Sequence, residues 1–306
     1  MFDDDGYEIQ RLNMKDFRRY KSLREAQYGP FSTQKLLAFT KEFPDRIVSL
    51  YSIEFPEPQA YLMLQIREGI DELDAWIYQL AFNPYLPLEG LEKLVDYAEF
   101  YFKSKQFTKI RMLVRFTQRK LVDVLYKRGW RAVDRIAIYE KNDISNLLID
   151  YKTLDRRYRI IDADPNVHFD GVVNVDRSAF RVGHRIPLET LKRHLANPGS
   201  FVCIDTEDND RVVGYNYNSV NTNKVAHFIR LAALDGYKRL GIGSHLLRNA
   251  LQWFYSIGIE YCYLRAIPES AGAKLYEKFG FYNVTMECTY EKDFNGSSDE
   301  KGIECF

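Results

Sequence analysis

The chain has 306 residues and a mass of 36.0 kDa, and 46% of its residues are hydrophobic and 28% charged. These values fit two ordinary folded domains and exclude a wholly disordered chain, a collagen-like fibre and a disulfide scaffold. The 43 basic residues balance the 43 acidic ones, so the chain lacks the cationic surplus expected of a general nucleic-acid binder.

The first half alternates helical and strand patterns. The helix between its third and fourth expected strands carries apolar residues at 91, 94, 95, 98 and 102, a helical spacing. In chain order we expect helices at 15–27 and 32–42, strands at 47–54, 60–67 and 73–82, helix 91–102, strand 110–115, helix 118–128 and strand 132–139.

The second half shows the same order after the polar stretch 142–156. Its most regular helix is amphipathic, and its last helix opens on Ser270 as a cap. We expect a strand at 158–162, helices at 175–180 and 187–196, strands at 201–205, 212–218 and 225–234, helix 241–257, strand 261–266, helix 270–279 and strand 281–290.

The sequences of the two halves are similar to each other, as expected for two copies of one unit. A shift of 151 residues aligns Tyr139-Glu140-Lys141 with Tyr290-Glu291-Lys292, and Gly129 with Gly280, among other matches spread along both halves. Such a fixed offset indicates an internal repeat. The alternative is chance identity between unrelated α/β domains.

The sequence shows no sign of secretion, membrane insertion or metal binding. The acidic start MFDDDGYEIQ has no apolar core of a signal peptide, and no apolar run is long enough for a transmembrane helix. The four cysteines lack a CxxC spacing, and the five histidines do not cluster with them. We therefore expect a cytoplasmic protein with reduced cysteines and no metal.

A glycine-containing loop precedes the helix expected at 241–257. It reads Lys238-Arg239-Leu240-Gly241-Ile242-Gly243-Ser244. The glycines let the backbone approach a ligand, and the free amides and dipole of a helix start favour a pyrophosphate. Taken alone this G-x-G is a weak signal, because glycines also open helices for packing reasons.

This loop, together with two further segments, resembles the GNAT superfamily of N-acetyltransferases. The loop is similar to the family's acetyl-CoA loop, with Lys238 where Gln or Arg is usual. The strand 227–234 is similar to its bulged strand, and the segment 273–281, with Leu275, Tyr276 and Gly280, to its last helix. Glu269 stands where the family often has Asn.

The resemblance covers about residues 157–293. The first half is related to the family only through its similarity to the second half at the offset of 151. The implied fold is α/β (α+β): two tandem GNAT-like domains, each a mixed, largely antiparallel central sheet flanked by helices. We expect a degenerate domain at 1–145, the acetyl-CoA-binding catalytic domain at 156–293 and a flexible tail at 294–306. At an offset of 151, Glu92 replaces the second glycine of the loop, Glu89 adds negative charge, and Leu125 replaces Tyr276. The first copy is therefore expected to bind no acetyl-CoA.

The resemblance implies the roles of individual residues. Tyr276 matches the tyrosine that protonates the leaving thiolate, and His227 lies where the family places an acid–base residue; a structural strand histidine, with water carrying the proton, is the equal alternative. The donor acetyl-CoA would be held by the bulged strand and the loop, at Leu231, Ala232, Ala233, Lys238, Arg239, Leu240, Gly241, Ile242, Gly243 and Ser244.

The acceptor site is expected at the loop after the first helix of the second half and at the neighbouring strands. Its candidate residues are Phe180, Arg181, Tyr215, Tyr217 and Arg230, with Arg181, Arg185 and Arg230 as possible partners of a carboxylate. The resemblance implies transfer of the acetyl group to a primary amine in a ternary complex, in a monomer or homodimer. The alternatives are a non-catalytic acyl-CoA-binding regulatory protein and another acyl transfer, such as aminoacyl transfer.

Overall fold

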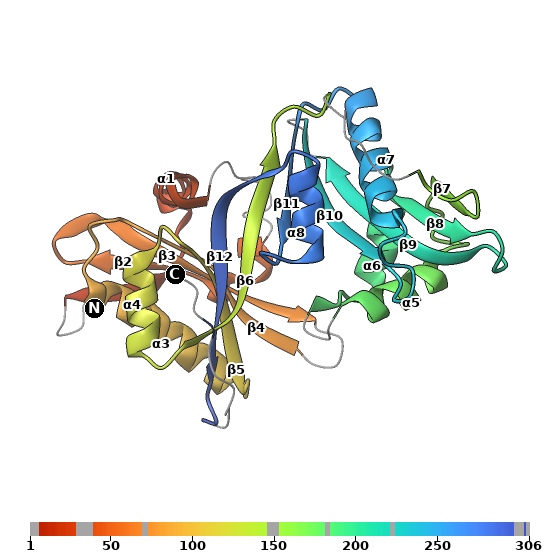
Figure 1. Cartoon of the computed structure of the whole chain (residues 1–306). Coiled ribbons are helices and arrows are strands. Elements are labelled where there is room, and N and C mark those ends of the chain that lie inside the picture. The colour runs from red at the N-terminus through yellow and green to blue at the C-terminus, as the bar shows by residue number, and fades with distance from the viewer. Residues whose placement is uncertain are drawn as a thin grey trace. The chain divides into compact units, whose positions relative to one another are not determined.

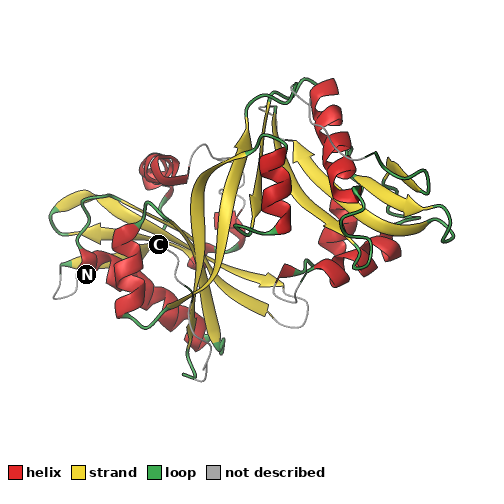
Figure 2. Cartoon of the chain, viewed as in Figure 1, coloured by secondary structure: helices red, strands yellow, loops and turns green. Residues whose placement is uncertain are grey.

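The structure is a computed structural model that describes residues 6–28, 39–68, 73–145, 153–180, 184–220, 224–296 and 303. The chain forms two compact units, each built on a sheet with helices on its faces (Figures 1 and 2). Unit 1 comprises residues 1–68, 72–135 and 287–306, and unit 2 comprises residues 69–71 and 136–286.

Unit 1 has the strand order β1-β2-β3-β4-β5-β12, in which only the pair β4–β5 is parallel. Leu94, Val95, Ala98 and Phe102 of α3 pack with Leu121 and Leu125 of α4 on one face of this sheet, while Tyr20 and Leu23 of α1 pack on the other. The elements are β1 (Tyr7–Arg11), α1 (Phe17–Tyr28), β2 (Ile47–Ser52), β3 (Phe55–Glu68), β4 (Leu73–Phe82), α3 (Leu88–Ser104), β5 (Lys109–Arg115), α4 (Arg119–Lys127) and β6 (Arg131–Lys141).

Unit 2 has the strand order β6-β11-β10-β9-β8-β7, again with one parallel pair, β10–β11. Helices α7 and α8 pack on one face around Leu247, Phe254 and Tyr276. Helices α5 and α6 pack on the other around Val172, Leu191 and Tyr215. The elements are β7 (Tyr158–Asp162), α5 (Phe169–Ala179), α6 (Leu188–Leu195), β8 (Phe201–Asp205), β9 (Arg211–Val220), β10 (Val225–Ala233), α7 (Ile242–Ser256), β11 (Tyr261–Ala266), α8 (Ala271–Lys278) and β12 (Tyr282–Asp293).

The two repeats exchange their last strands. The end of β12, which closes the second repeat in sequence, pairs with β5 from Glu287 to Asp293 and buries Cys288 and Tyr290 in the core of unit 1 (Figure 1). The end of β6, which closes the first repeat, pairs with β11 and buries Ala137 and Tyr139 in the core of unit 2. The ranges expected from sequence, 1–145 and 156–293, leave each strand in its own repeat, so the compact units differ from them at both ends.

The repeat is visible in the structure itself. β1 and β7 coincide under the shift of 151, and a bulge falls at Tyr78 of β4 and at its counterpart Ile229 of β10. Between these strands and the following helices the offset grows by one. The buried positions Leu94, Val95, Ala98 and Phe102 of α3 correspond to 246, 247, 250 and 254 of α7, a shift of 152. The single offset expected from sequence is therefore wrong in this stretch, because the second repeat has one more residue between its bulge and the buried positions of its helix.

The expected mixed α/β architecture is confirmed, and most of its elements lie within a few residues of their expected bounds. The main differences are at element starts: α5 begins at Phe169 rather than 175, β3 at Phe55 rather than 60 and α3 at Leu88 rather than 91. The strand β1 is not among those expected from sequence. Part of the helix expected at 32–42 and most of the expected tail 294–306 lie outside the described residues. The ring of Phe294, the first residue of that tail, packs against the core of unit 1.

The cysteines follow the expectation only in part. Cys203 and Cys262 are buried free thiols, and burial raises the pKa of both to about 12, so they are inert. Cys288 is disulfide-bonded, with a partner outside the described residues.

Candidate active site

The centre of unit 2 is a strand that separates from its neighbour. β10 pairs with β11 only over Val225–Phe228, then bulges at Ile229 and continues alongside β9 alone. The predicted donor-binding residues Leu231, Ala232 and Ala233 follow this bulge. Among the described residues, no strand pairs with this edge of β10, so its backbone polar groups are available to a ligand.

The predicted phosphate loop runs from Lys238 to the first turn of α7. Arg239 has φ +64 and Gly241 has φ +90, both left-handed, and the second conformation strongly favours glycine. Gly243 lies beside Leu231 and Leu275, so the start of α7 packs against the bulged strand. The N-terminal turn of α7 has no side-chain cap and no acidic residue, whereas α8 is capped by Ser270.

The amides of the first turn of α7 are therefore open to an anion. Of the cations in the loop, Lys238 pairs with Asp235 at 2.5 Å, and Arg239 is exposed with no ion-pair partner among the described residues. The predicted loop thus combines an uncapped helix start with one exposed arginine and a lysine that Asp235 partly neutralises.

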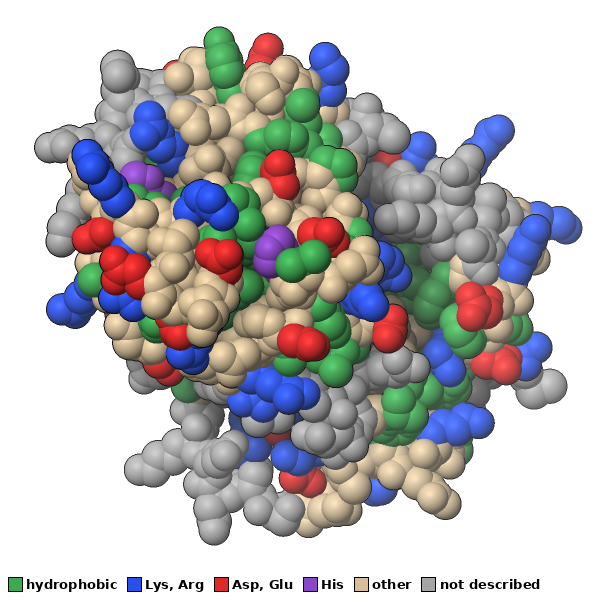
Figure 3. All heavy atoms as spheres, turned by 90° about the vertical axis from the view of Figure 1, so that its right-hand side faces the viewer, with side chains coloured by type: hydrophobic (Ala, Val, Ile, Leu, Met, Phe, Trp, Pro, Cys, Tyr) green, Lys and Arg blue, Asp and Glu red, His purple; other side chains and the backbone are tan. Residues whose placement is uncertain are grey.

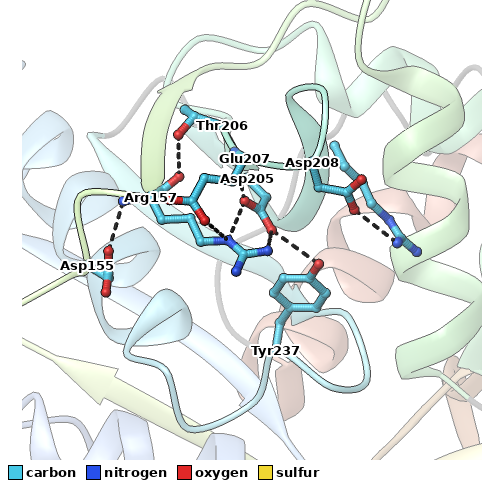
Figure 4. A network of polar contacts seen from close by, with 8 residues as sticks. Asp155, Arg157, Asp205, Thr206, Glu207, Asp208 and Tyr237 are labelled. Carbon is cyan, nitrogen blue, oxygen red and sulfur yellow. Dashed lines mark hydrogen bonds and ion pairs between the residues drawn. The ribbon is translucent and has the colours of Figure 1, made fainter.

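A buried carboxylate anchors Tyr237, the residue that precedes the loop (Figure 4). Asp205 at the end of β8 is fully buried, accepts two hydrogen bonds of 2.6 Å from Arg157, and accepts a third of 3.2 Å from the Tyr237 hydroxyl. The Arg157 guanidinium holds the pKa of Asp205 below its usual value. Ser178 of α5 adds a second anchor by donating to Asp235 at 3.1 Å.

The matching place in unit 1 is built differently. α3 begins three residues earlier than expected, so residues 88–90 form a helical turn where unit 2 has its loop. Under the shift of 152, Glu89 corresponds to Gly241, and Glu92 corresponds to Ser244 rather than to Gly243. Glu92 pairs with Lys127 at 2.6 Å, and Gly90 packs tightly on Leu86 and Leu50. The acidic first turn and the filled space oppose an anion here.

Tyr276 lies in the core of unit 2, on α8. Its ring packs edge-on against Phe228 of β10 at 6.1 Å and against Phe281 at 5.9 Å. Burial alone raises the pKa of its phenol well above the usual value, so the hydroxyl keeps its proton at neutral pH. The structure thereby brings this side chain beside the strand that carries the bulge.

His227 of β10 points to the opposite face of the sheet from Ala226 and Phe228, which belong to the α7–α8 core. Its ring stacks on Tyr263 of β11 at 4.4 Å. Burial, with Arg265 and His194 nearby, lowers its pKa to about 4. The value near 6.5 on which the expectation of a base rested does not hold, because the partly buried imidazole is a much weaker base.

Three of the predicted acceptor residues, Phe180, Tyr215 and Arg230, come together around a charge pair that the sequence did not reveal. Arg230 donates to Asp176 of α5 at 2.6 Å, to the Tyr215 hydroxyl at 3.1 Å and to the carbonyl of His184 at 2.9 Å. Its guanidinium lies over the Phe180 ring at 3.6 Å, and the Tyr215 hydroxyl also donates to Asp176. Arg230 is therefore fully engaged within the protein.

The two other arginines expected to bind a carboxylate differ in what the structure says of them. Arg185 donates to the carbonyls of Phe180 and Arg177, so it closes the C-terminal end of α5. Arg181 lies outside the described residues. Tyr217 is buried and stacks on His194 of α6 at 5.1 Å.

The sequence did not indicate four residues that fix the positions of the acceptor residues and of the loop before α7: Asp176, Arg157, Asp205 and Tyr237. Asp176 carried a usable signal, since it lies four residues after Val172 on the apolar face of α5 and so had to be buried with a partner. The Arg157–Asp205–Tyr237 contacts join three segments far apart in the sequence, and nothing in the local sequence pairs them.

No group of residues suited to hold a metal ion occurs in the part of the chain that the structure describes. Within the same ranges, no helix is long and apolar enough to cross a membrane. On the face shown in Figure 3, acidic and basic side chains are interspersed, which agrees with the zero net charge.

Residues 169–281 match the model of the acetyltransferase (GNAT) family. No curated protein matches the sequence significantly. Among solved structures, the fold is similar to a GCN5-related N-acetyltransferase from Sphaerobacter thermophilus, with a TM-score of 0.75 and 15% identity over 99% of both chains.

Two further structures show the same likeness. One is a glucosamine N-acetyltransferase region of a fungal multi-domain GH3 β-N-acetylglucosaminidase, with a TM-score of 0.72, 14% identity, and coverage of 94% of this chain and 38% of that one. The other is a tandem GNAT protein from the clavulanic acid biosynthesis pathway, with a TM-score of 0.67, 11% identity, and coverage of 96% and 100%. At such identities the likeness concerns the fold. Residues 169–281 thus belong to the acetyltransferase (GNAT) family, and the whole chain has the fold of tandem GNAT proteins.

Proposed function

We propose that this protein is an N-acetyltransferase that moves the acetyl group of acetyl-CoA to a primary amine, by direct attack in a ternary complex. The reaction takes place in unit 2, and the first repeat binds no acetyl-CoA. The observation that carries the proposal is the start of α7, where a left-handed Gly241 opens an uncapped helix beside the separated strand β10.

The donor fits this place by its chemistry. The free amides at the start of α7, with Arg239, would hold the pyrophosphate, and the unpaired edge of β10 at Leu231–Ala233 would bond the pantetheine arm. An amide of the same edge directed at the thioester oxygen would stabilise the charge that develops there during attack.

The reaction forms a C–N bond and breaks the C–S bond of the thioester. The amine nitrogen attacks the carbonyl carbon, the oxyanion collapses, and the thiolate leaves. Tyr276, which keeps its phenol proton at neutral pH, supplies this proton to the thiolate, although burial makes it a weaker acid than a free phenol. The proton from nitrogen passes to His227 or to water.

The test is a pair of substitutions at one position. Ser244→Glu introduces into the first turn of α7 the carboxylate that Glu92 has in α3, while Ser244→Gln keeps the size without the charge. We expect Ser244→Glu to weaken acetyl-CoA binding about tenfold or more through repulsion of the pyrophosphate. Ser244→Gln should bind nearly as the wild type does, as measured by calorimetry.

A third variant separates chemistry from binding. Tyr276→Phe should keep the affinity for acetyl-CoA and lower kcat by about tenfold or more, if the phenol protonates the thiolate. The cofactor assignment is wrong if the wild type shows neither calorimetric binding nor a rise in Tm with acetyl-CoA. Binding without turnover of any amine would instead favour the regulatory alternative.

A further inference from the structure

The end of β12 carries a disulfide-bonded cysteine. Cys288 lies opposite Val114 of β5, is fully buried and belongs to the core of unit 1. Cys203 and Cys262 are free thiols, and both are buried in unit 2. Because the chain has only four cysteines, Cys305 is left as the partner of Cys288.

The position of Ile303 agrees with this pairing. Its backbone amide donates to the carbonyl of Ala132 at 2.9 Å. Ala132 belongs to β6, the neighbour of β12 in the sheet, and lies in the same buried cluster as Cys288. Two residues of chain span at most about 7 Å, and the Cα atoms of bonded cysteines lie about 4.4–6.8 Å apart. A cysteine two residues after Ile303 can therefore reach Cys288.

The end of the chain thus holds both of the strands that the repeats exchange. β12 enters the sheet of unit 1 at Glu287, and β6 continues into unit 2 after Arg135. The disulfide fastens β12, and the hydrogen bond from Ile303 fastens β6. A bond between positions 288 and 305 also closes residues 289–304 into a loop, which lowers the conformational entropy of the unfolded chain and so stabilises unit 1.

The place of the bond at a chain end makes it accessible to thiols. Ile303 is 41% exposed, and its amide bond to Ala132 is its only backbone contact of this kind among the described residues. Chain ends open locally at a much lower free-energy cost than buried strands do. A reductant would therefore reach the disulfide before the core of unit 1 unfolds.

We propose that Cys288 and Cys305 form a redox-sensitive crosslink that fastens the end of the chain to unit 1. The oxidant is a small-molecule disulfide of the glutathione kind. One protein thiolate attacks it and releases one thiol, and the second protein thiolate then attacks the mixed disulfide and releases the other. The two protein thiols lose two electrons and two protons, which the two released thiols carry. A dithiol reverses the reaction, and β12 is then held less firmly.

The first test is the thiol content of the unfolded protein. After equilibration with oxidised glutathione we expect two titratable thiols per chain, those of Cys203 and Cys262, and four after reduction with dithiothreitol. Mass spectrometry of a non-reduced digest should show the peptides of Cys288 and Cys305 joined. Four thiols under oxidising conditions, a bond to Cys203 or Cys262, or a bond between two chains would each refute the crosslink.

The second test uses Cys305→Ser, which removes the bond and leaves the buried Cys288 in place. Dithiothreitol should lower the Tm of unit 1 in the wild type by about 5 °C or more. Cys305→Ser should show this lower Tm with and without the reductant. Reduction of the wild type should also accelerate hydrogen exchange in β12, residues 287–293, but not in β10, residues 225–233.

Two outcomes of the second test would overturn the proposal. A Tm that falls equally in both proteins would mean that the reductant acts elsewhere. A Tm that falls in neither would mean that the bond does not fasten β12. Neither measurement uses acetyl-CoA or an amine, so the crosslink and the proposed acetyltransferase activity are tested independently.

Discussion

The environment of His227 decides what this residue can do. Its ring is packed on Tyr263, and its pKa is lowered from 6.5 to about 4, so it stays neutral throughout the physiological range. A neutral imidazole can accept a hydrogen bond from an amine or a water, but it holds a proton poorly. The sequence motif fixed the position of this histidine, while its basicity depends on neighbours from β11 and α6.

The lowered pKa predicts a dependence of stability on acidity. Because the folded pKa lies below the unfolded one, the unfolded chain takes up a proton more readily, and stability is lost as pH falls from about 6.5 to 4. The loss attributable to His227 is up to about 3 kcal/mol from a shift of this size. His227→Gln should therefore lose less stability over this range than the wild type, as measured by urea unfolding at several pH values. Parallel losses in both proteins would contradict the assignment.

Elements of unit 2 are joined at the acceptor side by one buried ion pair. Asp176 of α5 and Arg230 of β10 have side chains only 4% and 11% exposed, and Tyr215 of β9 bonds both. A buried ion pair contributes little net stability compared with apolar residues of the same size, but removing one partner leaves a buried charge. The pair therefore fixes position more than it stabilises.

Substitutions at Asp176 and Arg230 test this role, and the double variant is their internal control. Asp176→Asn should lower the free energy of unfolding by about 3 kcal/mol, because it leaves Arg230 buried without its carboxylate. The double variant Asp176→Leu with Arg230→Met should recover much of that loss, yet keep a raised KM for the amine, because Phe180 and His184 are no longer held. Equal destabilisation by the single and double variants would argue against this account.

Helix starts show which parts of an element the sequence predicts. The apolar spacing located the interiors of α3 and α7 correctly, since side-chain periodicity depends only on the helix itself. It did not show that α3 begins at Leu88 or that the buried positions of the two helices are shifted by 152 rather than 151. Gly90 in this first turn packs closely on Leu86 and on Leu50 of β2, and the contact with Leu50 joins elements far apart in the sequence.

At the scale of the whole chain, the exchange of last strands makes each unit depend on both repeats. Glu291 of β12 is buried in unit 1 and pairs with Arg111, Arg131 and Lys109. Burial acts to raise the pKa of Glu291, but the hydrogen bond and charge of Arg111 lower it overall. Its counterpart in the first repeat, Glu140, pairs instead with β11 of unit 2.

Two equivalent substitutions should therefore affect opposite units. Glu291→Leu leaves Arg111 and Arg131 without their shared carboxylate and should destabilise unit 1 by about 3 kcal/mol. Hydrogen exchange should then accelerate in β5, residues 109–115, and not in β11. Glu140→Leu should accelerate exchange in β11, residues 261–266. Faster exchange of β11 in Glu291→Leu would show that the strands are not exchanged.

The sequence by itself determined the repeat, the order of elements in each copy, the glycine loop before α7 and the place of Tyr276 on α8. These features follow from local sequence patterns, namely helical and strand periods, left-handed turns that need glycine, and a capping serine. The tertiary structure decided which sheet each last strand joins and how strongly His227 binds a proton. It also decided that Arg230 forms an ion pair with Asp176 and is not left to bind a ligand. Each of these depends on partners far away in the sequence, and burial sets the strength of their interactions, which no single segment encodes.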